Sequence, residues 1–327
     1  MDGNYGRGGG PRRGALRAMP RSAGPRHRKW WGDPVGYLFI APAVLLFLLF
    51  NGYPIVRTII MSFQHYVWTD PNHVYFNGLH NYSNMLTDSG FHDALIVSLK
   101  VLGVALPVRL ILAMICAVFI SRVTMRLAAT YRVVVWLPYI LPVAVTMRTW
   151  SLLYDPMFGY PGYILSNLGL NPPDWLHDPM AVLPAFDVAL VWEGFGFATL
   201  IFLIGIYNIS PELVEAAAVD GAGAWRQFWS VTLPLLRPMI LLVLVVSLMP
   251  LLQATGEALN FVQPGGGGLS LPGGPGDAST TLGLYVYNTA FKSPMNLGYA
   301  SAMNMTLLVV GIVVSLAVFK AMRAIES

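Results

Sequence analysis

Long apolar runs alternate with shorter polar stretches along the chain after residue 33. Six runs can be recognised, and they lie at about 36–62, 93–120, 128–152, 185–207, 234–256 and 299–322. Each contains the roughly 20 residues that an α-helix needs to cross about 30 Å of hydrocarbon. The pattern therefore predicts an all-α polytopic membrane protein with six transmembrane helices.

The composition supports a single membrane domain. The chain has 327 residues, of which 55% are hydrophobic and only 11% are charged, whereas soluble domains typically carry about 25% charged residues. We expect one domain over 34–324. The Gly-, Pro- and Arg-rich segment 1–33 cannot bury a core and is predicted to be disordered. A cytoplasmic anchor is a better interpretation of this segment than a nucleic-acid-binding arm.

The positive charges are placed asymmetrically between the apolar runs. Arginine and lysine occur in 121–132, in 207–238 and after residue 319, whereas 63–92 and 153–184 contain aspartate but no lysine or arginine. Positive residues stay on the cytoplasmic side of a membrane. We therefore expect both termini and the loop 207–238 to be cytoplasmic.

One polar stretch, 211–238, has the pattern of two short helices joined by a turn. Ser210 is a candidate N-cap, and Pro211 at the first helical position loses no needed N–H. Gly221 and Gly223 predict a break after the first helix. The second helix carries three aromatic residues on one face, namely Trp225, Phe228 and Trp229. By pattern alone, this stretch is either an ordinary connecting loop or a docking element.

The sequence EAAAVDGA at 215–222, followed by VTLP at 231–234, resembles the EAA loop of ABC importer permeases. The longer run EAAAVDGAGAWRQF is similar to the carbohydrate-importer branch, and the resemblance covers most of 34–324. It implies the type I ABC importer permease fold, in which this hairpin is a cytoplasmic coupling helix that inserts into a cleft of an ATPase subunit. The coupling residues that the resemblance implies are Glu215, Ala216, Ala217, Asp220, Gly221, Phe228 and Pro234. A glycine run at 265–268 looks like an insertion within 251–272.

The resemblance also implies an assembly. The chain would form half of the pathway for a mono- or oligosaccharide in the bacterial plasma membrane. Its partners would be a second related permease that completes a heterodimer, two ATPase subunits, an extracytoplasmic sugar-binding protein and the lipid bilayer, but no nucleic acid. The partner ATPase would use ATP and Mg.

Chemistry on this chain itself is not expected. The sequence contains no Walker A motif, no nucleophile elbow and no paired cysteine ligands. The four histidines within 63–92 have spacings that match no usual metal-ligand pattern. We therefore expect no enzymatic activity, no bound cofactor and no metal.

Polar residues at membrane depth are the candidates for a substrate site, because a charge near the bilayer centre costs on the order of 2.5–3.5 kcal/mol. They are Lys100, Arg109, Arg148, Glu193, Gln253, Glu257 and Asn304. Glu193 is the most informative, since it lies among aromatic residues. Aromatic faces stack on sugar rings, and carboxylates and amides bond sugar hydroxyls. A structural carboxylate within a packed aromatic face is the alternative.

In carbohydrate importers, the stretch about twenty residues before the EAA glutamate and the following helix line the sugar site. The substrate-binding residues that this resemblance implies are Trp192, Glu193, Phe195, Phe197, Ser247, Gln253 and Glu257. Two other functions stay open. An ABC importer of a polyol or a glycerophosphodiester is one, although a phosphodiester would favour Arg or Lys over Glu193 and Glu257. An ion-coupled secondary transporter is the other, and it predicts internal repeats, which the sequence does not show.

Overall fold

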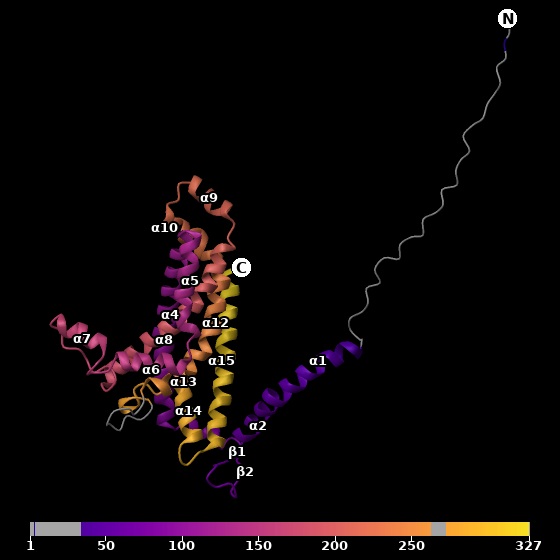
Figure 1. The fold of residues 1–327 in the computed structure, drawn as a ribbon. Helices are drawn as coiled ribbons and strands as arrows, with labels where there is room; N and C mark the ends of the chain where they lie inside the picture. Colours follow the sequence, from indigo (N-terminus) through magenta and orange to yellow (C-terminus); the bar gives the residue numbers. More distant parts are fainter. Residues whose placement is uncertain (1–2, 4–33, 263–272, 327) are drawn as a thin grey trace. The chain divides into compact units, whose positions relative to one another are not determined.

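The computed structural model describes residue 3 and residues 34–262 and 273–326. The remainder of the basic segment 1–33 and the glycine run 265–268 lie outside the described residues, so the disorder and the insertion predicted there stay predictions. Almost all of the described regular structure is helical. The strands within it are β1 (Gln64–His65) and β2 (Tyr75–Phe76), which form one antiparallel pair. The predicted all-α class is therefore confirmed (Figure 1).

The chain divides into two compact units, residues 1–54 and residues 55–327. The described part of the first unit comprises α1 (Pro34–Phe47), the π-helical turn η1 (Leu48–Gly52) and the first residues of α2 (Tyr53–Ser62). Its side chains are apolar and exposed, as Leu38 and Phe39 illustrate. A lipid environment accounts for such exposure, because lipid tails cover apolar side chains as protein does.

The second unit contains the remaining helices. Its N-terminal half comprises α3 (His80–Met85), α4 (Ser89–Arg122), α5 (Met125–Ile140), α6 (Val143–Leu153), α7 (Tyr160–Asn167) and α8 (Pro179–Tyr207). Its C-terminal half comprises α9 (Pro211–Val219), α10 (Ala224–Gln227), η2 (Phe228–Thr232), α11 (Leu233–Leu235), α12 (Arg237–Gln253), α13 (Thr255–Phe261), η3 (Pro275–Asp277), α14 (Leu282–Phe291) and α15 (Leu297–Glu326).

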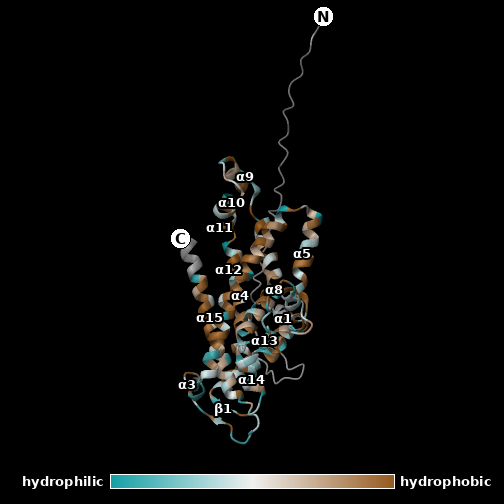
Figure 2. Ribbon diagram, turned by 90° about the vertical axis from the view of Figure 1, so that its left-hand side faces the viewer, coloured by the Kyte–Doolittle hydropathy of each residue, from teal (hydrophilic) through white to brown (hydrophobic). Residues whose placement is uncertain are grey.

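Long helices that run side by side form the body of this second unit. Helix α4 packs along α8 and also contacts α12, while α5 packs on α8 and α15 on α12. Helices α9 and α10 lie at one end of the bundle, and α14 lies at the other end together with the two strands (Figure 1). The helices of the bundle are mainly hydrophobic, whereas the region around α3 and β1 is largely hydrophilic (Figure 2).

The described helices agree with a multi-pass membrane protein. Four unbroken helices are long and apolar enough to cross a bilayer, and they cover Tyr37–Ser62, Ser89–Arg122, Pro179–Tyr207 and Leu297–Lys320. Two bent helix pairs raise this number to as many as six if each pair forms one crossing. The predicted count of six spans therefore stays a prediction.

The prediction of one helix over 128–152 is wrong, because α5 and α6 meet at an angle of 95°. Leu141 between them has extended backbone angles, with ψ of 141°. The ring of Pro142 excludes the residue before it from the helical region, and proline itself donates no backbone N–H. The chain therefore turns at Leu141, and α6 packs against α13.

The fifth apolar run, 234–256, also ends earlier than predicted. Ala254 has φ of 37° and terminates α12, so α13 is a separate short helix. Likewise, 258–298, which lies between the fifth and sixth predicted runs, contains the ten-residue helix α14. A helix of ten residues is too short for a membrane crossing, so hydropathy does not single this helix out.

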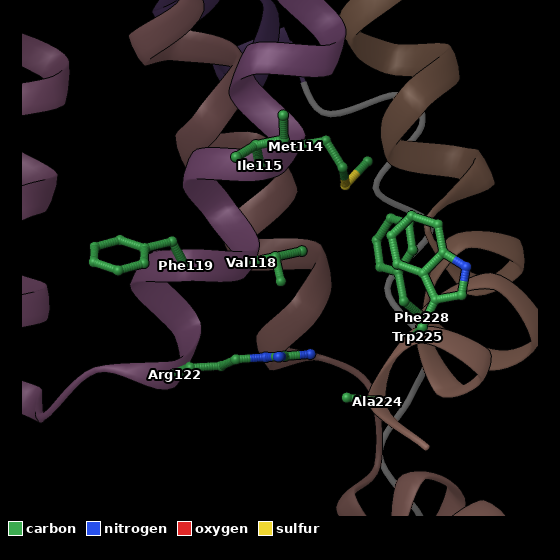
Figure 3. A pocket seen from close by; sticks show the side chains of 8 residues that line it. All are labelled: Met114, Ile115, Val118, Phe119, Arg122, Ala224, Trp225 and Phe228. Atoms are coloured by element: carbon green, nitrogen blue, oxygen red, sulfur yellow. The ribbon is translucent and has the colours of Figure 1, made fainter. Parts of the chain in front are cut away.

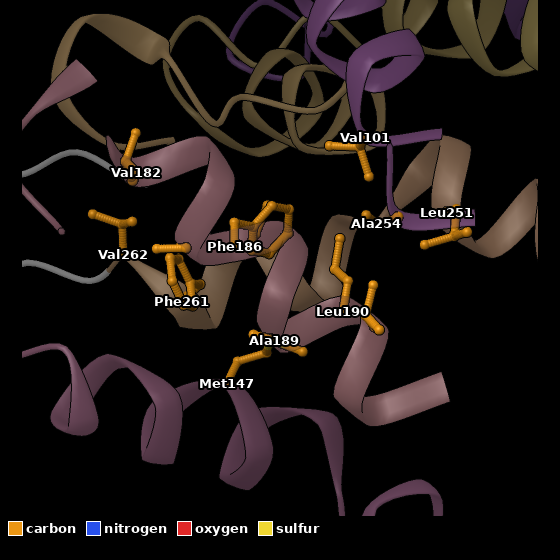
Figure 4. Packing of buried hydrophobic residues seen from close by; sticks show 14 of the residues in the cluster. Val101, Met147, Val182, Phe186, Ala189, Leu190, Leu251, Ala254, Phe261 and Val262 are labelled. Atoms are coloured by element: carbon orange, nitrogen blue, oxygen red, sulfur yellow. The ribbon is translucent and has the colours of Figure 1, made fainter. Parts of the chain in front are cut away.

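A cluster of apolar side chains holds the centre of the second unit (Figure 4). Phe186 of α8 and Phe261 of α13 are fully buried, with ring centroids 5.2 Å apart. Gly196 of α8 lets α5 approach closely, because a Cβ atom there would lie 2.0 Å from the carbonyl oxygen of Val135. The packing thus fixes α8 between α5 and α13.

Asp88 joins three helices at the end of the bundle opposite α9. Its carboxylate caps α4 by accepting from the backbone N–H of Gly90 at 3.0 Å. It also accepts from the hydroxyls of Tyr285 of α14 at 2.8 Å and Tyr299 of α15 at 2.6 Å. Burial raises the pKa of Asp88, but these hydrogen bonds outweigh it and hold the pKa below its ordinary value. The carboxylate is therefore ionised at neutral pH, and its hydrogen bonds are charge-assisted.

We expect Asp88→Ala to lower the free energy of unfolding by about 2 kcal/mol or more, since it removes a helix cap and two charge-assisted hydrogen bonds. Thermal unfolding of the purified protein in detergent measures this loss. The depressed pKa means that the stabilisation is present above the ordinary value of 3.8 and is lost as the pH falls below it. Asp93→Ala, an exposed position on the same helix, is the control. An equal loss in both variants would contradict the role given to Asp88.

Candidate functional site

A cavity of about 140 Å³ lies between α4, α5, α8, α12 and α13. Four of the seven predicted substrate-binding residues line it together, and they are Glu193, Phe197, Ser247 and Glu257. Arg109 of α4 and Tyr139 of α5 complete its polar lining. The structure therefore brings three of the seven polar residues predicted at membrane depth, Arg109, Glu193 and Glu257, to one place.

Local structure explains how these side chains meet. Glu193 and Phe197 are four residues apart on α8, so they lie on the same face of the helix. Ser247 is buried on α12, whereas Glu257 lies in the first turn of α13. Because Ala254 ends α12, the chain turns there, and Glu257 lines the same cavity as Ser247.

Arg109 is the buried charge of this cavity, with 7% of its surface exposed. Its Nη2 atom donates to the backbone carbonyl of Leu190 at 2.5 Å, while its Nε atom has no hydrogen-bond partner within the described residues. The guanidinium lies against Gly194, where a Cβ atom would be 2.2 Å from Cζ. Gly194 thus gives α4 the space to carry an arginine beside α8.

The charges around Arg109 are complementary but not paired directly. Glu193 and Glu257 both interact electrostatically with its guanidinium. Neither carboxylate forms an ion pair of 4.0 Å or less with it in the described part of the chain. A small cavity with one guanidinium and two carboxylates that are not directly joined leaves donors and acceptors available to a ligand.

An aromatic pair forms one wall of the same cavity. The rings of Tyr139 and Phe197 are stacked, with centroids 5.1 Å apart and an interplanar angle of 26°. Apolar and aromatic walls with a few convergent polar groups are typical of small-molecule sites. The arrangement can therefore bind a ligand that presents both hydroxyl groups and an apolar ring face.

The other three predicted substrate residues line different cavities. Gln253 shares a cavity of about 360 Å³ with Asn304 of α15. Trp192 and Phe195 face an open, mainly apolar cavity of about 950 Å³ between α4 and α8. Trp192 packs edge to face against Trp150 there, at 5.7 Å between ring centroids. Their role in substrate binding stays a prediction.

Sequence reasoning missed two residues and left a third unplaced. Arg109 was recognised as a charge at membrane depth, but nothing in the sequence indicated its neighbours. Tyr139 carries no signal within its apolar run. Asp187, buried on α8 and lining the cavity of Trp192, could have been found as an acid within an apolar run. Its Oδ1 atom has no hydrogen-bond partner among the described residues.

The predicted helix, turn and helix are present between 211 and 227. Helix α9 starts with Pro211 and ends in a turn at Gly221, whose φ of 81° is the left-handed value expected for it. The N–H of Ala222 donates to the carbonyl of Ala217 at 2.9 Å, and that of Gly221 donates to Ala218 at 3.0 Å. This is the Schellman arrangement that terminates helices at glycine. Ser210 takes the N-cap position, but its side chain makes no capping hydrogen bond.

Most of the predicted coupling residues lie at the surface of this segment. Glu215, Ala216, Asp220 and Gly221 are exposed, Ala217 and Phe228 are half-buried, and Pro234 is half-buried within α11. Val219 of α9 is also 88% exposed. The three predicted aromatic residues contact one another, with ring centroids 5.5 to 6.4 Å apart. An exposed helix with apolar side chains has the composition of a docking element.

The end of α8 anchors this segment to the bundle. Leu236, at the 62° bend before α12, is fully buried. It packs against Gly205 of α8, where a Cβ atom would lie 2.6 Å from its Cδ2 atom. The segment 211–236 therefore starts and ends beside the same turn of α8.

Two of the four histidines of the 63–92 region, His65 and His73, have local partners. His73 Nδ1 lies 2.8 Å from a carboxylate oxygen of Asp70, and His65 stacks on Tyr75 at 5.0 Å. Within the described ranges, no three His, Cys, Asp or Glu side chains are grouped so that they could hold a metal ion.

Comparison with known proteins relates this architecture to one family. Residues 89–325 match the family described as binding-protein-dependent transport system inner membrane component. The lactose transport system permease protein of Rhizobium radiobacter is 29% identical over 301 residues, which cover 90% of this chain and 96% of that protein. The trehalose/maltose transport system permease protein of Thermococcus litoralis is 32% identical over 254 residues, with 78% and 82% covered.

Solved structures show the same fold. A chain from the crystal structure of a bacterial ABC transporter that imports the acidic polysaccharide alginate superposes with a TM-score of 0.74 at 23% identity, covering 90% of this chain and 97% of that chain. A second structure shows the bacterial alginate transporter in complex with an alginate pentasaccharide-bound periplasmic protein. It superposes with a TM-score of 0.72 at 22% identity, covering 90% of this chain and 95% of that chain. The predicted ABC importer permease fold is confirmed.

The family model covers well over half of the chain, and relatives with about 30% identity extend over most of it. The family is that of a membrane component of a transport system, which agrees with the expectation that the chain is not an enzyme. This multi-pass membrane protein therefore belongs to the family of binding-protein-dependent transport system inner membrane components.

Proposed function

We propose that this chain is the permease subunit of an ATP-driven sugar importer and that the cavity of Glu193 binds the sugar inside the membrane. The observation that carries the proposal is the grouping of Arg109, Glu193, Glu257 and Ser247 beside the stacked rings of Tyr139 and Phe197. The names of the relatives support the substrate class, because they include permeases for lactose and for trehalose/maltose. A permease for arabinooligosaccharides from Bacillus subtilis, 32% identical over 285 residues, is a further one.

Each polar group has a defined task in this proposal. Glu193 and Glu257 accept hydrogen bonds from sugar hydroxyls, whereas Ser247 both donates and accepts. The ring face of the sugar packs on Phe197. Arg109, held by Leu190, offsets part of the negative charge. Two carboxylates facing one guanidinium would repel a phosphodiester, so a sugar fits this cavity better than a glycerophosphodiester does.

The rest of the machinery belongs to partner subunits. We infer that a second related permease completes the pathway, that two ATPase subunits bind ATP and Mg, and that an extracytoplasmic binding protein delivers the sugar. The exposed segment 211–236 would contact an ATPase. Closure of the ATPases on ATP would then move this segment and, through α8, reopen the sugar cavity to the other side. A binding-protein-dependent family argues against the ion-coupled alternative.

Replacement of Glu193 tests the substrate site. Glu193→Gln keeps the shape but weakens charge-assisted hydrogen bonds by about 1.5 kcal/mol, so the KM for uptake of the transported sugar should rise about tenfold. Uptake of labelled lactose, trehalose, maltose and arabinooligosaccharides by cells or proteoliposomes measures it. Basal ATP hydrolysis of the purified complex should not change.

Asp93→Asn, which neutralises an exposed acid on α4, is the matched control and should leave the KM unchanged. Unaltered kinetics in Glu193→Gln would remove this residue from the site. Failure of the complex to assemble would instead support the structural carboxylate.

The turn of the proposed coupling segment can be tested with its two glycines. Gly221→Val forces a β-branched residue into a left-handed conformation at a cost of about 1–2 kcal/mol, although a Cβ atom there meets no neighbour within 4 Å. We expect transport to fall while binding-protein affinity is unchanged, and ATPase stimulation by loaded binding protein to be lost.

Gly223→Ala is the matched control, because Gly223 has φ of −66° and open space around its Cα. It should retain both transport and stimulation. If Gly221→Val also retained both, the segment would not transmit coupling.

The proposed orientation can be tested by labelling in a Cys116→Ala background. A cysteine replacing Ser83, which is exposed on α3, should react with an impermeant maleimide in intact cells. A cysteine replacing Ala218, exposed on α9, should react only after permeabilisation. The physical reason is that lysine and arginine concentrate on the side of α9. The opposite labelling pattern would reverse the orientation.

A further inference from the structure

A further cavity, separate from that of Glu193, lies where α4 meets the segment that follows α9. Its volume is about 450 Å³, and its walls come from the last turns of α4 and from α10 and η2. The walls are apolar, with Met114 and Val118 on one side and Trp225 and Phe228 on the other (Figure 3). None of its lining residues lines the cavity of Glu193, although α10 and η2 belong to the proposed coupling segment 211–236.

Arg122 is the one charged side chain that lines it. It belongs to the last turn of α4 and is exposed, and its side chain extends toward Ala224 of α10 (Figure 3). It forms no ion pair with the residues that the structure describes. The following segment adds Arg126 and Arg132, and 121–132 contains no acidic residue. The lining of the cavity therefore carries one positive charge, and the neighbouring segment 121–132 adds no acid to offset it.

The position of the cavity along the span is equally informative. The apolar helix Ser89–Arg122, which is long enough to cross a bilayer, ends at this arginine, so the cavity lies at one end of a candidate membrane span. Trp225 at its rim is 74% exposed. Tryptophan is enriched at this depth, because its ring is apolar and its N–H seeks a polar partner.

We propose that this cavity binds one anionic phospholipid of the surrounding bilayer. The acyl chain would pack between Val118 and Phe228, and the phosphate would accept hydrogen bonds from the Arg122 guanidinium. A free inorganic anion would leave the apolar walls unused, and an uncharged lipid would leave Arg122 unpaired. Basic pockets at the ends of membrane helices recognise anionic headgroups through this combination.

The lipid would connect α4 to α10, which is part of the proposed coupling segment 211–236. Its presence would hold that segment against the bundle, so ATP hydrolysis would be coupled to transport more efficiently in anionic membranes. This consequence rests on the proposed function, whereas lipid binding itself does not.

Native mass spectrometry of the full chain in detergent tests the binding. The probes are phosphatidylglycerol and phosphatidylcholine with identical acyl chains. One phosphatidylglycerol should be retained at about fivefold lower concentration than phosphatidylcholine, the preference expected from one arginine near the headgroup. Arg122→Gln should remove this preference. Arg126→Gln, an exposed arginine that does not line the cavity, should keep it.

Three further experiments identify the ligand. Val118→Trp fills the apolar part of the cavity and should prevent retention of both lipids. If Val118→Trp does not fold, the loss of lipid preference in Arg122→Gln still tests the site. Glycerol 3-phosphate should not displace the bound lipid, and displacement would show a free-anion site instead. A photo-crosslinker at Trp225 should capture lipid in the assembled complex, whereas capture of a partner subunit alone would overturn the proposal. Equal retention of the two lipids by the wild-type chain would also overturn it.

Transport by the complex in vesicles separates lipid binding from its effect on coupling. With the preference for phosphatidylglycerol established, sugar transported per ATP hydrolysed should be lower in phosphatidylcholine vesicles than in vesicles with one quarter phosphatidylglycerol. Equal coupling in both would refute the coupling role of the bound lipid while leaving the binding site in place.

Discussion

The burial of Arg109 between α4 and α8 is the interaction on which the interior of the second unit depends. A charge at membrane depth must be solvated by protein, and here one backbone carbonyl and the field of two carboxylates do so. The guanidinium fits only because residue 194 is glycine. The same contact that brings α4 and α8 together therefore also leaves Glu193 and Glu257 facing a cavity with unused hydrogen-bonding capacity.

Helix α8 connects that cavity with the exposed segment at the end of the bundle. Glu193 lies near its middle, and Gly205 near its end contacts Leu236, where the segment rejoins α12. Packed helices move as rigid elements, because interiors are dense. A force applied to α9 would thus reach the cavity through a single continuous helix and through the bend before α12. Helix α8 and the bend before α12 are therefore sufficient to connect the two sites in the proposed coupling.

The departures from the predicted spans come from backbone breaks inside apolar sequence. Pro142 turns the chain between α5 and α6, and the left-handed Ala254 ends α12 before its apolar run is complete. Neither break changes hydropathy, so a count of apolar residues does not detect it. Both breaks position the site, since α6 packs on α13 and Glu257 belongs to α13.

The sequence by itself determined the features that depend on near neighbours in the chain. Apolar length indicated the membrane class, Pro211 the start of α9, and Gly221 its end with positive φ. Only the tertiary structure decided which residues share a cavity. Helix α8 is apolar on nearly all sides, so no amphipathic stripe marks its buried face. Its neighbours place Glu193 toward Arg109 and Trp192 toward Trp150, because packing between distant helices, and not periodicity within one, selects the face that each residue occupies.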